Sequence, residues 1–242
     1  MKSVVGRRLS RCFDCNRLQS IAVDCNRRPS LARFALIGLL LAFGACEASA
    51  FTISSKFVSP RNAERAERKA TKYLILHTTE GGAAGALAKL RENGEAHYCV
   101  DTNGVIYRII DRKKVALHCG LSMWKGERNI DQCSIGIEIV GTHDKPPTAA
   151  QIRALKELLA ELKGIYKIKD DAVLTHSMVA YGTPNKWQKK DHRGRKRCGM
   201  LFAGTALRAQ IGLRSKPAYD PDLRDKRLVD GDPDLTKILY QK

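Results

Sequence analysis

Residues 73–82 read Tyr-Leu-Ile-Leu-His-Thr-Thr-Glu-Gly-Gly, an apolar run that ends in a histidine and is followed by small polar residues and a glycine pair. A short apolar run that meets a turn signal predicts a buried strand, with His77 at its carboxyl end. In open α/β sheets, ligands bind at the carboxyl ends of the strands. His77 is therefore a candidate site residue, although a single strand-end histidine is more often a hydrogen-bonded core residue.

The first 50 residues have the pattern of an export signal. An apolar run at residues 34–45 (FALIGLLLAFGA) follows several arginines and precedes Ala48-Ser49-Ala50. The run is too short to span a bilayer, and the small residues after it are typical of a cleavage site. We expect a signal peptide over residues 1–50, cleaved after Ala50. The sequence Phe43-Gly44-Ala45-Cys46 leaves a second outcome open, lipidation of Cys46. Either outcome predicts export to the periplasm or cell envelope.

The chain is strongly basic, with 43 Lys and Arg against 25 Asp and Glu and a net charge of +18. Residues 1–50 hold 8 of the basic and 3 of the acidic residues, which leaves +13 on residues 51–242. Such a charge favours anionic partners through long-range attraction. Nucleic acid and an anionic cell-wall polymer both qualify, and the predicted export favours the polymer. We expect no nucleic-acid partner.

Four of the eight cysteines lie in residues 1–50, where Cys12-x-x-Cys15 has no second pair and is weak evidence for a zinc ribbon. An exported protein can form disulfides between its remaining cysteines. Cys119 and Cys133 are the first pair to test, although the sequence does not assign the pairing. The remaining cysteines are Cys99, Cys119, Cys133 and Cys198.

Strands and helices alternate after the first strand. Asn103-Gly104 is a strong turn signal between two β-rich runs, and Thr148 is a candidate N-cap for a helix whose apolar residues share one face. This alternation, with one hairpin, predicts an α/β fold in which helices flank a central mixed β-sheet. The expected elements are a helix at 82–92, a hairpin at 96–110, a loop with one short strand at 111–133, a strand at 134–140, a helix from 148 to about 163, a strand at 172–176, a basic loop at 177–197 and a helix at 200–211.

The length suits one domain with appendages. We expect a lead-in segment at 51–71, the main domain at 72–212, and a charged tail at 213–242 with too few apolar residues to pack.

Two histidines and one cysteine form a candidate metal site. His77 and His176 each end a predicted strand, so a central sheet would bring them to one edge, and Cys198 follows the basic loop. Two imidazoles and a thiolate with an open fourth position are typical of catalytic zinc. By spacing alone the signal is weak, since the same residues would equally suit two core histidines and a disulfide-bonded cysteine.

Several segments together resemble a known family, the zinc N-acetylmuramoyl-L-alanine amidases. This family includes the phage lysozyme-type amidases, the bacterial anhydromuropeptide and outer-membrane amidases, and the animal peptidoglycan-recognition proteins. The resemblance spans roughly residues 72–211, and residues 118–138 are similar to the cell-wall-recycling branch. The segments are Tyr73–Thr79, Ala96–Tyr107, Ser134–Glu138 and Lys196–Cys198.

The resemblance implies roles for single residues. It makes His77, His176 and Cys198 the ligands of Zn²⁺, Glu138 the catalytic carboxylate, and Lys196 the group that stabilises the oxyanion. The spacing between His176 and Lys196 is longer than in many members, so His192 remains an alternative ligand. Three further positions match the family outside the metal site and are candidates for substrate binding, although His97 suits a strand histidine and His118 an ordered loop equally well; they are His97, His118 and Trp124.

The resemblance also implies a function: hydrolysis of the amide between N-acetylmuramic acid and L-alanine in peptidoglycan or muropeptides, by a monomer. A non-catalytic peptidoglycan-binding module of the same fold is the alternative. The basic loop around Trp187 is either a solvated surface or a lip that faces the substrate.

Overall fold

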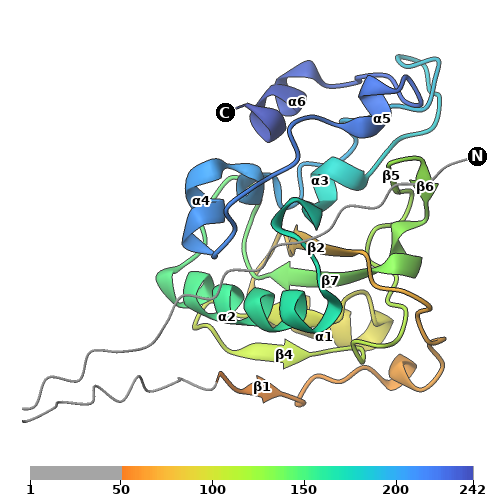
Figure 1. The fold of residues 1–242 in the computed structure, drawn as a ribbon. Helices are drawn as coiled ribbons and strands as arrows, with labels where there is room; N and C mark the ends of the chain where they lie inside the picture. Colours follow the sequence, from red (N-terminus) through yellow and green to blue (C-terminus); the bar gives the residue numbers. More distant parts are fainter. Residues whose placement is uncertain (1–50, 242) are drawn as a thin grey trace, which may run out of the picture. The chain divides into compact units, whose positions relative to one another are not determined.

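The computed structural model describes residues 51–241, so the predicted signal peptide and Cys46 lie outside the described residues. A six-stranded sheet forms the centre, in the order β1-β4-β3-β7-β2-β8 (Figure 1). Strands β3 and β4 are antiparallel and the other neighbours are parallel. The prediction of a mixed sheet flanked by helices is confirmed. The strands of this sheet are β1 (Ile53–Ser54), β2 (Tyr73–Thr78), β3 (Tyr98–Val100), β4 (Ile106–Arg108), β7 (Ser134–Ile139) and β8 (Val173–Thr175).

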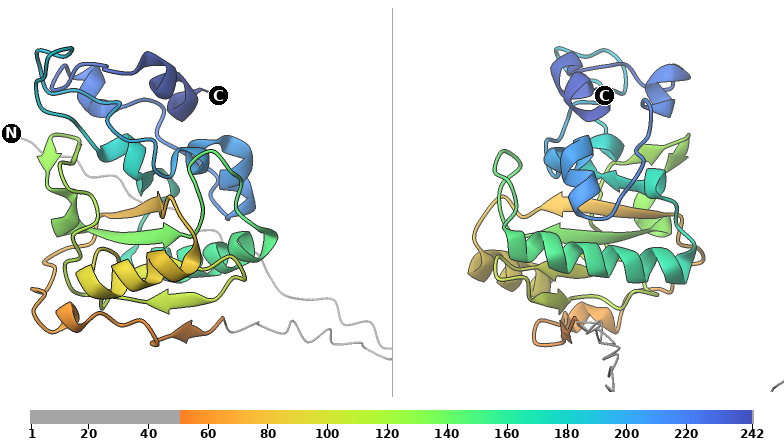
Figure 2. Two further views of the ribbon diagram at one scale, coloured as in Figure 1. Left: turned by 180° about the vertical axis from the view of Figure 1, so that it is seen from behind. Right: turned by 60° about the vertical axis from the view of Figure 1, so that its left-hand side comes forward.

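Helices cover both faces of the sheet. Figure 1 shows α2 in front of the strands, and the view from behind in Figure 2 shows α1 in front of them. The α-helices are α1 (Ala83–Asn93), α2 (Ala149–Tyr166), α3 (His176–Val179), α4 (Thr205–Gln210), α5 (Pro221–Arg224) and α6 (Pro233–Tyr240). Within residues 51–241, no helix combines the length and the apolar character needed to cross a membrane.

Helix α2 packs on one face of the sheet. It begins as predicted at Thr148, whose side chain accepts from the N–H of Gln151 while the Gln151 side chain returns a bond to the cap. This reciprocal pair satisfies two N–H groups that the first helical turn leaves free. The helix continues to Tyr166, past the predicted end near Lys163. Its buried leucines pack on every second residue of β2 and β7; the partners are Leu155, Leu158, Leu159 and Leu162 with Leu74, Leu76, Ile135 and Ile137.

The other face of the sheet carries the chemistry. Side chains alternate along a strand, so His77 and Glu138 point away from α2. Helix α1 covers the β3 side of this face through Leu87 and Leu90, and it ends as predicted at Gly94, which is left-handed with φ 64°. Helices α3 and α6 cover the β2 and β8 side. The uncovered part between them lies above the ends of β2 and β7.

Three local predictions need correction. The predicted lead-in at 51–71 is partly sheet, because β1 pairs with β4 and forms one edge of the sheet, and the 3-10 helix η1 (Pro60–Asn62) follows it. The loop at 111–133 holds two short strands, β5 (Met123–Trp124) and β6 (Glu127–Arg128), and not one. The helix predicted at 200–211 is a 3-10 turn, η4 (Met200–Ala203), followed by α4, with Gly204 between them.

The prediction of an unpacked C-terminal tail is wrong. Helix α6 buries Leu235, Leu239 and Tyr240 in the same apolar cluster as Met178 of α3. Asp232 caps this helix, and its side chain accepts from the N–H of Leu235 at 3.0 Å. The few apolar residues of this segment suffice because they fall on one face of a short capped helix.

Candidate active site

Strand pairing brings the predicted base beside the first predicted ligand. In the register of the parallel strands β2 and β7, His77 is the partner of Glu138. The distance from His77 Nδ1 to Glu138 Oε1 is 3.7 Å. Both residues occupy the same face of adjacent strands, so their juxtaposition follows from the register.

The two remaining predicted ligands arrive from opposite ends of the long loop. His176 is the first residue of α3, one position past the end of β8, and Cys198 follows the basic loop. The N–H of Ser177 donates to the Cys198 carbonyl at 3.1 Å, which ties the two segments together. Cys198 Sγ lies 3.7 Å from His77 Nδ1 and accepts from the N–H of Thr78 at 3.3 Å.

The donor atoms of His77, His176 and Cys198 lie within 4.8 Å of one another, as expected of metal ligands. Tetrahedral zinc, with bonds of about 2.0–2.3 Å, separates neighbouring nitrogen and sulfur donors by about 3.3–3.6 Å. The 3.7 Å between His77 Nδ1 and Cys198 Sγ is close to that separation. His176 Nε2 donates to the Cys119 carbonyl at 3.1 Å, which leaves Nδ1 of His176 with its lone pair free.

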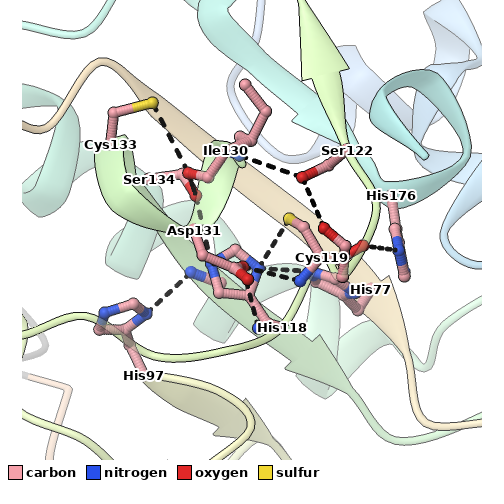
Figure 3. A network of polar contacts seen from close by, with 12 residues as sticks. His77, His97, His118, Cys119, Ser122, Ile130, Asp131, Cys133, Ser134 and His176 are labelled. Atoms are coloured by element: carbon pink, nitrogen blue, oxygen red, sulfur yellow. Dashed lines mark hydrogen bonds and ion pairs between the residues drawn. The ribbon is translucent and has the colours of Figure 1, made fainter. Parts of the chain in front are cut away.

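A second group of potential ligands, His77, His118 and Cys119, also falls within 4.8 Å. Its atoms face one another at hydrogen-bond distances, because His118 Nδ1 lies 3.0 Å from His77 Nε2 and 3.1 Å from Cys119 Sγ (Figure 3). Donors this close are too near for a shared tetrahedral ion. The first group therefore suits a metal ion, and the second is a hydrogen-bonded cluster behind it.

Burial disfavours charge on every group around this point. It lowers the pKa of His176 to about 4 and holds the pKa of His77 well below its usual value, with neighbouring histidines adding to the effect. Burial raises the pKa of the Cys198 thiol to about 12. Neutral imidazoles bind metals as they are, whereas the thiolate needs a cation beside it.

Glu138, beside this group, has one oxygen without a hydrogen-bond partner among the described residues. Burial, with the charges of Glu95 and Glu80 adding to it, raises the pKa of Glu138 to about 8. Its Oε2 atom is buried without a hydrogen-bond partner among the described residues. An unpartnered buried carboxyl costs free energy, and here it lies beside the proposed ligands.

A cavity of about 560 Å³ opens over these residues. Lys196 is exposed on its wall, near His176. The cavity joins the end of β2, helix α1, the loop after Leu117 and the end of the basic loop. Its lining includes His77, His118, Glu138, His176, Lys196 and Cys198.

Comparison with known proteins identifies the family. The family model for N-acetylmuramoyl-L-alanine amidase matches residues 67–198, more than half of the chain. The chain belongs to this amidase family.

Among individual relatives, the N-acetylmuramoyl-L-alanine amidase AmiD of Escherichia coli K12 is 29% identical over 163 residues, covering 60% of this chain and 55% of AmiD. The 1,6-anhydro-N-acetylmuramyl-L-alanine amidase AmpD of Haemophilus influenzae is 33% identical over 86 residues, 35% of this chain and 47% of AmpD. The chain thus spans about half the length of the curated relatives it matches. A solved complex of the E. coli AmiD with anhydro-N-acetylmuramic acid-L-Ala-D-gamma-Glu-L-Lys aligns with a TM-score of 0.43 at 26% identity, over 47% of this chain and 51% of that one.

Two residues that the amidase resemblance offered for substrate binding lie in the core. His97 is fully buried, with Nδ1 accepting from the N–H of Gly136 at 2.9 Å and Nε2 donating to the Lys114 carbonyl at 2.9 Å. Trp124 is 1% exposed and packs with Ile130. Neither lines the cavity, so the structure does not bring these two residues to the site. His118 does line it.

The structure does not bring the alternative ligand His192 to the other predicted ligands. It pairs through its backbone with Gly182, and its Nδ1 contacts the Lys190 carbonyl at 3.1 Å. It belongs neither to the group of possible metal ligands nor to the wall of this cavity. The extra length between His176 and Lys196 forms a projecting loop and leaves the order of the ligands unchanged.

That loop divides into parts with different surroundings. Arg195, Lys196 and Arg197 line the cavity, whereas Trp187 is 76% exposed and away from it. Arg193 is buried: Nε donates to Asp220 at 2.6 Å, and other guanidinium nitrogens reach Asp222 and backbone carbonyls. The predicted lip facing the substrate is thus limited to the three residues before Cys198.

The disulfide between Cys119 and Cys133 is absent. Both are free thiols, as are Cys99 and Cys198, the other described cysteines. Two further residues, Asp131 and Ser134, hold the region around Cys119 in place and were not predicted from the sequence. Asp131 Oδ1 accepts from the backbone N–H groups of His118 and Cys119 at 3.0 and 2.8 Å. An acidic residue just before the apolar strand β7 was the one available signal.

Proposed function

We propose that this chain is a zinc hydrolase that cleaves the amide between N-acetylmuramic acid and L-alanine in peptidoglycan or soluble muropeptides. The observation that carries the proposal is the group formed by His77, His176 and Cys198 with Glu138 beside it. Three ligands with an open fourth position are typical of catalytic zinc, whereas structural zinc has four protein ligands.

When bound, zinc acts as a Lewis acid and lowers the pKa of water toward neutrality. Glu138 accepts the proton of the attacking water and delivers it to the departing amine of the stem peptide. The unpartnered Oε2 suits this role, since no protein donor competes for its lone pairs. The pKa of about 8 refers to the protein without a metal, and a nearby cation would lower it.

Lys196 stabilises the negative charge that develops on the carbonyl oxygen of the scissile amide. Its ammonium group lies on the cavity wall near His176. One well-placed donor of this kind contributes about 3 kcal/mol to catalysis. Arg195 and Arg197 flank it and supply positive charge for the carboxylates of a stem peptide.

A peptidoglycan-binding module that lacks hydrolysis is the competing function. A buried carboxyl oxygen without a partner lowers the stability of the fold. A module that only binds gains nothing from such a group next to the predicted ligands. Glu138 therefore favours the enzyme.

The test measures metal content and amide cleavage on the same preparations. Purified protein should contain about one zinc per chain, and a chelator should remove zinc and activity together. His77→Ala, His176→Ala and Cys198→Ala should each lose both, while His192→Ala serves as the control that keeps both. A protein with bound zinc that releases no stem peptide from a muramyl-peptide would support the binding module instead. Protein without zinc, or loss of zinc on His192→Ala, would overturn the proposed metal site.

We further propose that the chain is exported to the periplasm or cell envelope and acts there as a monomer. The charged, apolar and small-residue regions before Ala50 support cleavage at that point. The intact mass of the mature protein should equal that of a chain beginning at Phe51. A mass that corresponds to a chain beginning at a diacylglyceryl-modified Cys46 would show a lipid anchor instead. Mass in solution tests the monomer.

A further inference from the structure

A chain of buried hydrogen bonds runs from His77 into the core, on the side away from the proposed metal site. His77 Nε2 lies 3.0 Å from His118 Nδ1, and His118 Nε2 lies 3.2 Å from Ser134 Oγ. Ser134 Oγ lies 2.7 Å from the backbone carbonyl of Ile130. Figure 3 shows that the His118 ring lies between His77 and Ser134.

The direction of every bond in this chain follows from its last member. A backbone carbonyl only accepts, so the Ser134 hydroxyl donates to Ile130. Ser134 Oγ then accepts from the N–H at Nε2 of His118, and a neutral His118 consequently has its lone pair on Nδ1. That lone pair accepts from His77, which must carry its hydrogen on Nε2. The lone pair of His77 is therefore on Nδ1, the atom that faces Cys198 and Glu138.

Two neighbours of His118 agree with this direction. Asp131 Oδ1 lies 3.7 Å from His118 Nε2, and a carboxylate beside that nitrogen favours a hydrogen on it. Cys119 Sγ lies 3.1 Å from His118 Nδ1, and its thiol hydrogen has the Asp131 carboxylate as an acceptor, so the lone pair on Nδ1 remains for His77.

We propose that His118, oriented by Ser134, is a positioning residue that fixes the Nε2–H tautomer of His77 and so presets Nδ1 as the metal donor. The proposal rests on the metal site of the proposed function and deepens it. An imidazole free to choose between tautomers would present the wrong nitrogen part of the time. Partners that orient a metal-ligating histidine typically contribute about 10- to 100-fold to metal affinity.

The strand beneath His118 fits this arrangement. A Cβ atom at Gly136 would lie 2.4 Å from His118 Cγ, so the imidazole rests directly on the backbone of β7. Any other residue at position 136 would displace the ring from His77.

His97 provides a matched control. It is a buried histidine on the same face, its ring centroid is 5.7 Å from that of His118, and both its nitrogens bond to backbone groups. No hydrogen bond joins it to His77 or His118 among the described residues. A change at His97 therefore removes a buried imidazole from the same part of the core and removes none of the hydrogen bonds that join His77, His118 and Ser134.

The test has two readouts that need no substrate. In metal-free protein with ¹⁵N-labelled histidine, NMR should show the hydrogen of His77 on Nε2. In a competition with a chromophoric chelator, His118→Leu should weaken zinc binding by about 10- to 100-fold, whereas His97→Leu should change it by less than about threefold. His118→Asn, which places an amide oxygen near the position of Nδ1, should recover most of the loss.

A hydrogen on Nδ1 of His77 in the unaltered protein would overturn the proposal, and this measurement does not depend on any variant folding. Equal zinc affinities of folded His118→Leu and His97→Leu would also overturn it. If zinc binding follows the expected order but the protein cleaves no muramyl amide, the proposed function fails and the positioning role of His118 stands.

Discussion

At the scale of single residues, Glu138 combines features that rarely occur together in a purely structural carboxyl. It lies on a buried strand, its pKa is raised to about 8, and one oxygen lacks a partner among the described residues. Perturbed carboxyls of this kind gather at functional sites. The fold holds the group in place because β7 is paired on both sides.

Glu138→Gln separates the chemistry from metal binding. The amide keeps the size of the side chain but cannot take a proton from water, so we expect turnover to fall by about 10²- to 10⁴-fold. Zinc content and substrate affinity should stay close to those of the unaltered protein. Glu161→Gln, on α2 at the opposite face, is the control and should retain activity. Normal turnover by Glu138→Gln would mean that another group is the base.

Gly199 is required by two separate constraints. Its φ is +73°, and a Cβ there would lie 2.4 Å from the Leu76 carbonyl oxygen. This close approach lets the chain turn against β2 directly after Cys198.

Gly199→Ala should therefore destabilise the fold and weaken zinc binding. Gly212→Ala is a matched control, since Gly212 also has a positive φ (79°) but its Cβ would meet only Lys156 Cγ at 3.4 Å. The control should cost about 1–2 kcal/mol, the ordinary penalty of the left-handed conformation, and leave zinc affinity intact. Denaturant unfolding and chelator competition measure both effects. Equal losses of stability and of zinc affinity in the two variants would show that the close approach of Gly199 to Leu76 is not required.

At the scale of elements, the segment after residue 213 packs against the basic loop and the apolar cluster that includes α3. Arg193 joins the basic loop to Asp220 and Asp222, and all three side chains are at most 3% exposed. A buried cation of this kind must be paired, and removal of one partner is costly. Helix α6 then packs against η4 and shares an apolar cluster with α3, which begins with the predicted ligand His176.

Leu235→Ala should show that α6 is part of the core. Leu235 is 1% exposed, so its truncation should lower the free energy of unfolding by about 2–5 kcal/mol. Ile238, on the same helix, is 44% exposed, and Ile238→Ala should cost much less. Denaturant unfolding of the two variants gives the comparison. If Leu235→Ala is as stable as Ile238→Ala, α6 does not contribute to the packed core.

At the scale of the whole molecule, the site imposes a pH dependence on the metal-free protein. Glu138 has a folded pKa of about 8 against a usual 4.5. Its contribution to the free energy of unfolding is complete below about pH 4.5 and is lost as the pH rises through 8. The reason is that the folded state retains a proton that the unfolded state releases. His176 has the opposite sign: its pKa falls from 6.5 to about 4, so its contribution is present above 6.5 and lost on acidification.

Metal-free protein should consequently have a broad stability maximum between about pH 4.5 and 6.5, where the opposite effects of Glu138 and His176 on the free energy of unfolding offset each other. Between pH 6.5 and 8.5 it should lose stability on the order of 2 kcal/mol, through Glu138 alone. Glu138→Gln should be free of this loss, and it should instead lose stability as the pH falls below 6.5, because Glu138 no longer offsets the effect of His176. Denaturant midpoints at several pH values, with a chelator present, provide the test. An equal alkaline loss in the variant would assign the effect to another group.

Much of this molecule is encoded in local patterns. The apolar run before His77, the Asn103-Gly104 turn and the leucine spacing after Thr148 specify strand, hairpin and helix by period and turn chemistry alone. Alternation along β7 also places Glu138 on the face opposite its isoleucines. The order of motifs was enough to predict the family, and it singled out His77, His176 and Cys198, whose donor atoms the structure brings together.

Other features depend on contacts that no local pattern encodes. The local sequence does not distinguish the surroundings of His97 and His118, yet His97 bonds to backbone groups in the core and His118 bonds to His77. His77 and Cys198 are 121 residues apart, and their meeting requires the order of strands and the turn at Gly199. The three buried side chains of α6 were too few to indicate packing by themselves. The sequence alone determined the elements and the residue types of the site, because these follow from periodicity and motif. Only the tertiary structure decided which buried side chain meets which, because hydrogen-bond partners and burial are set by strand pairing across the whole domain.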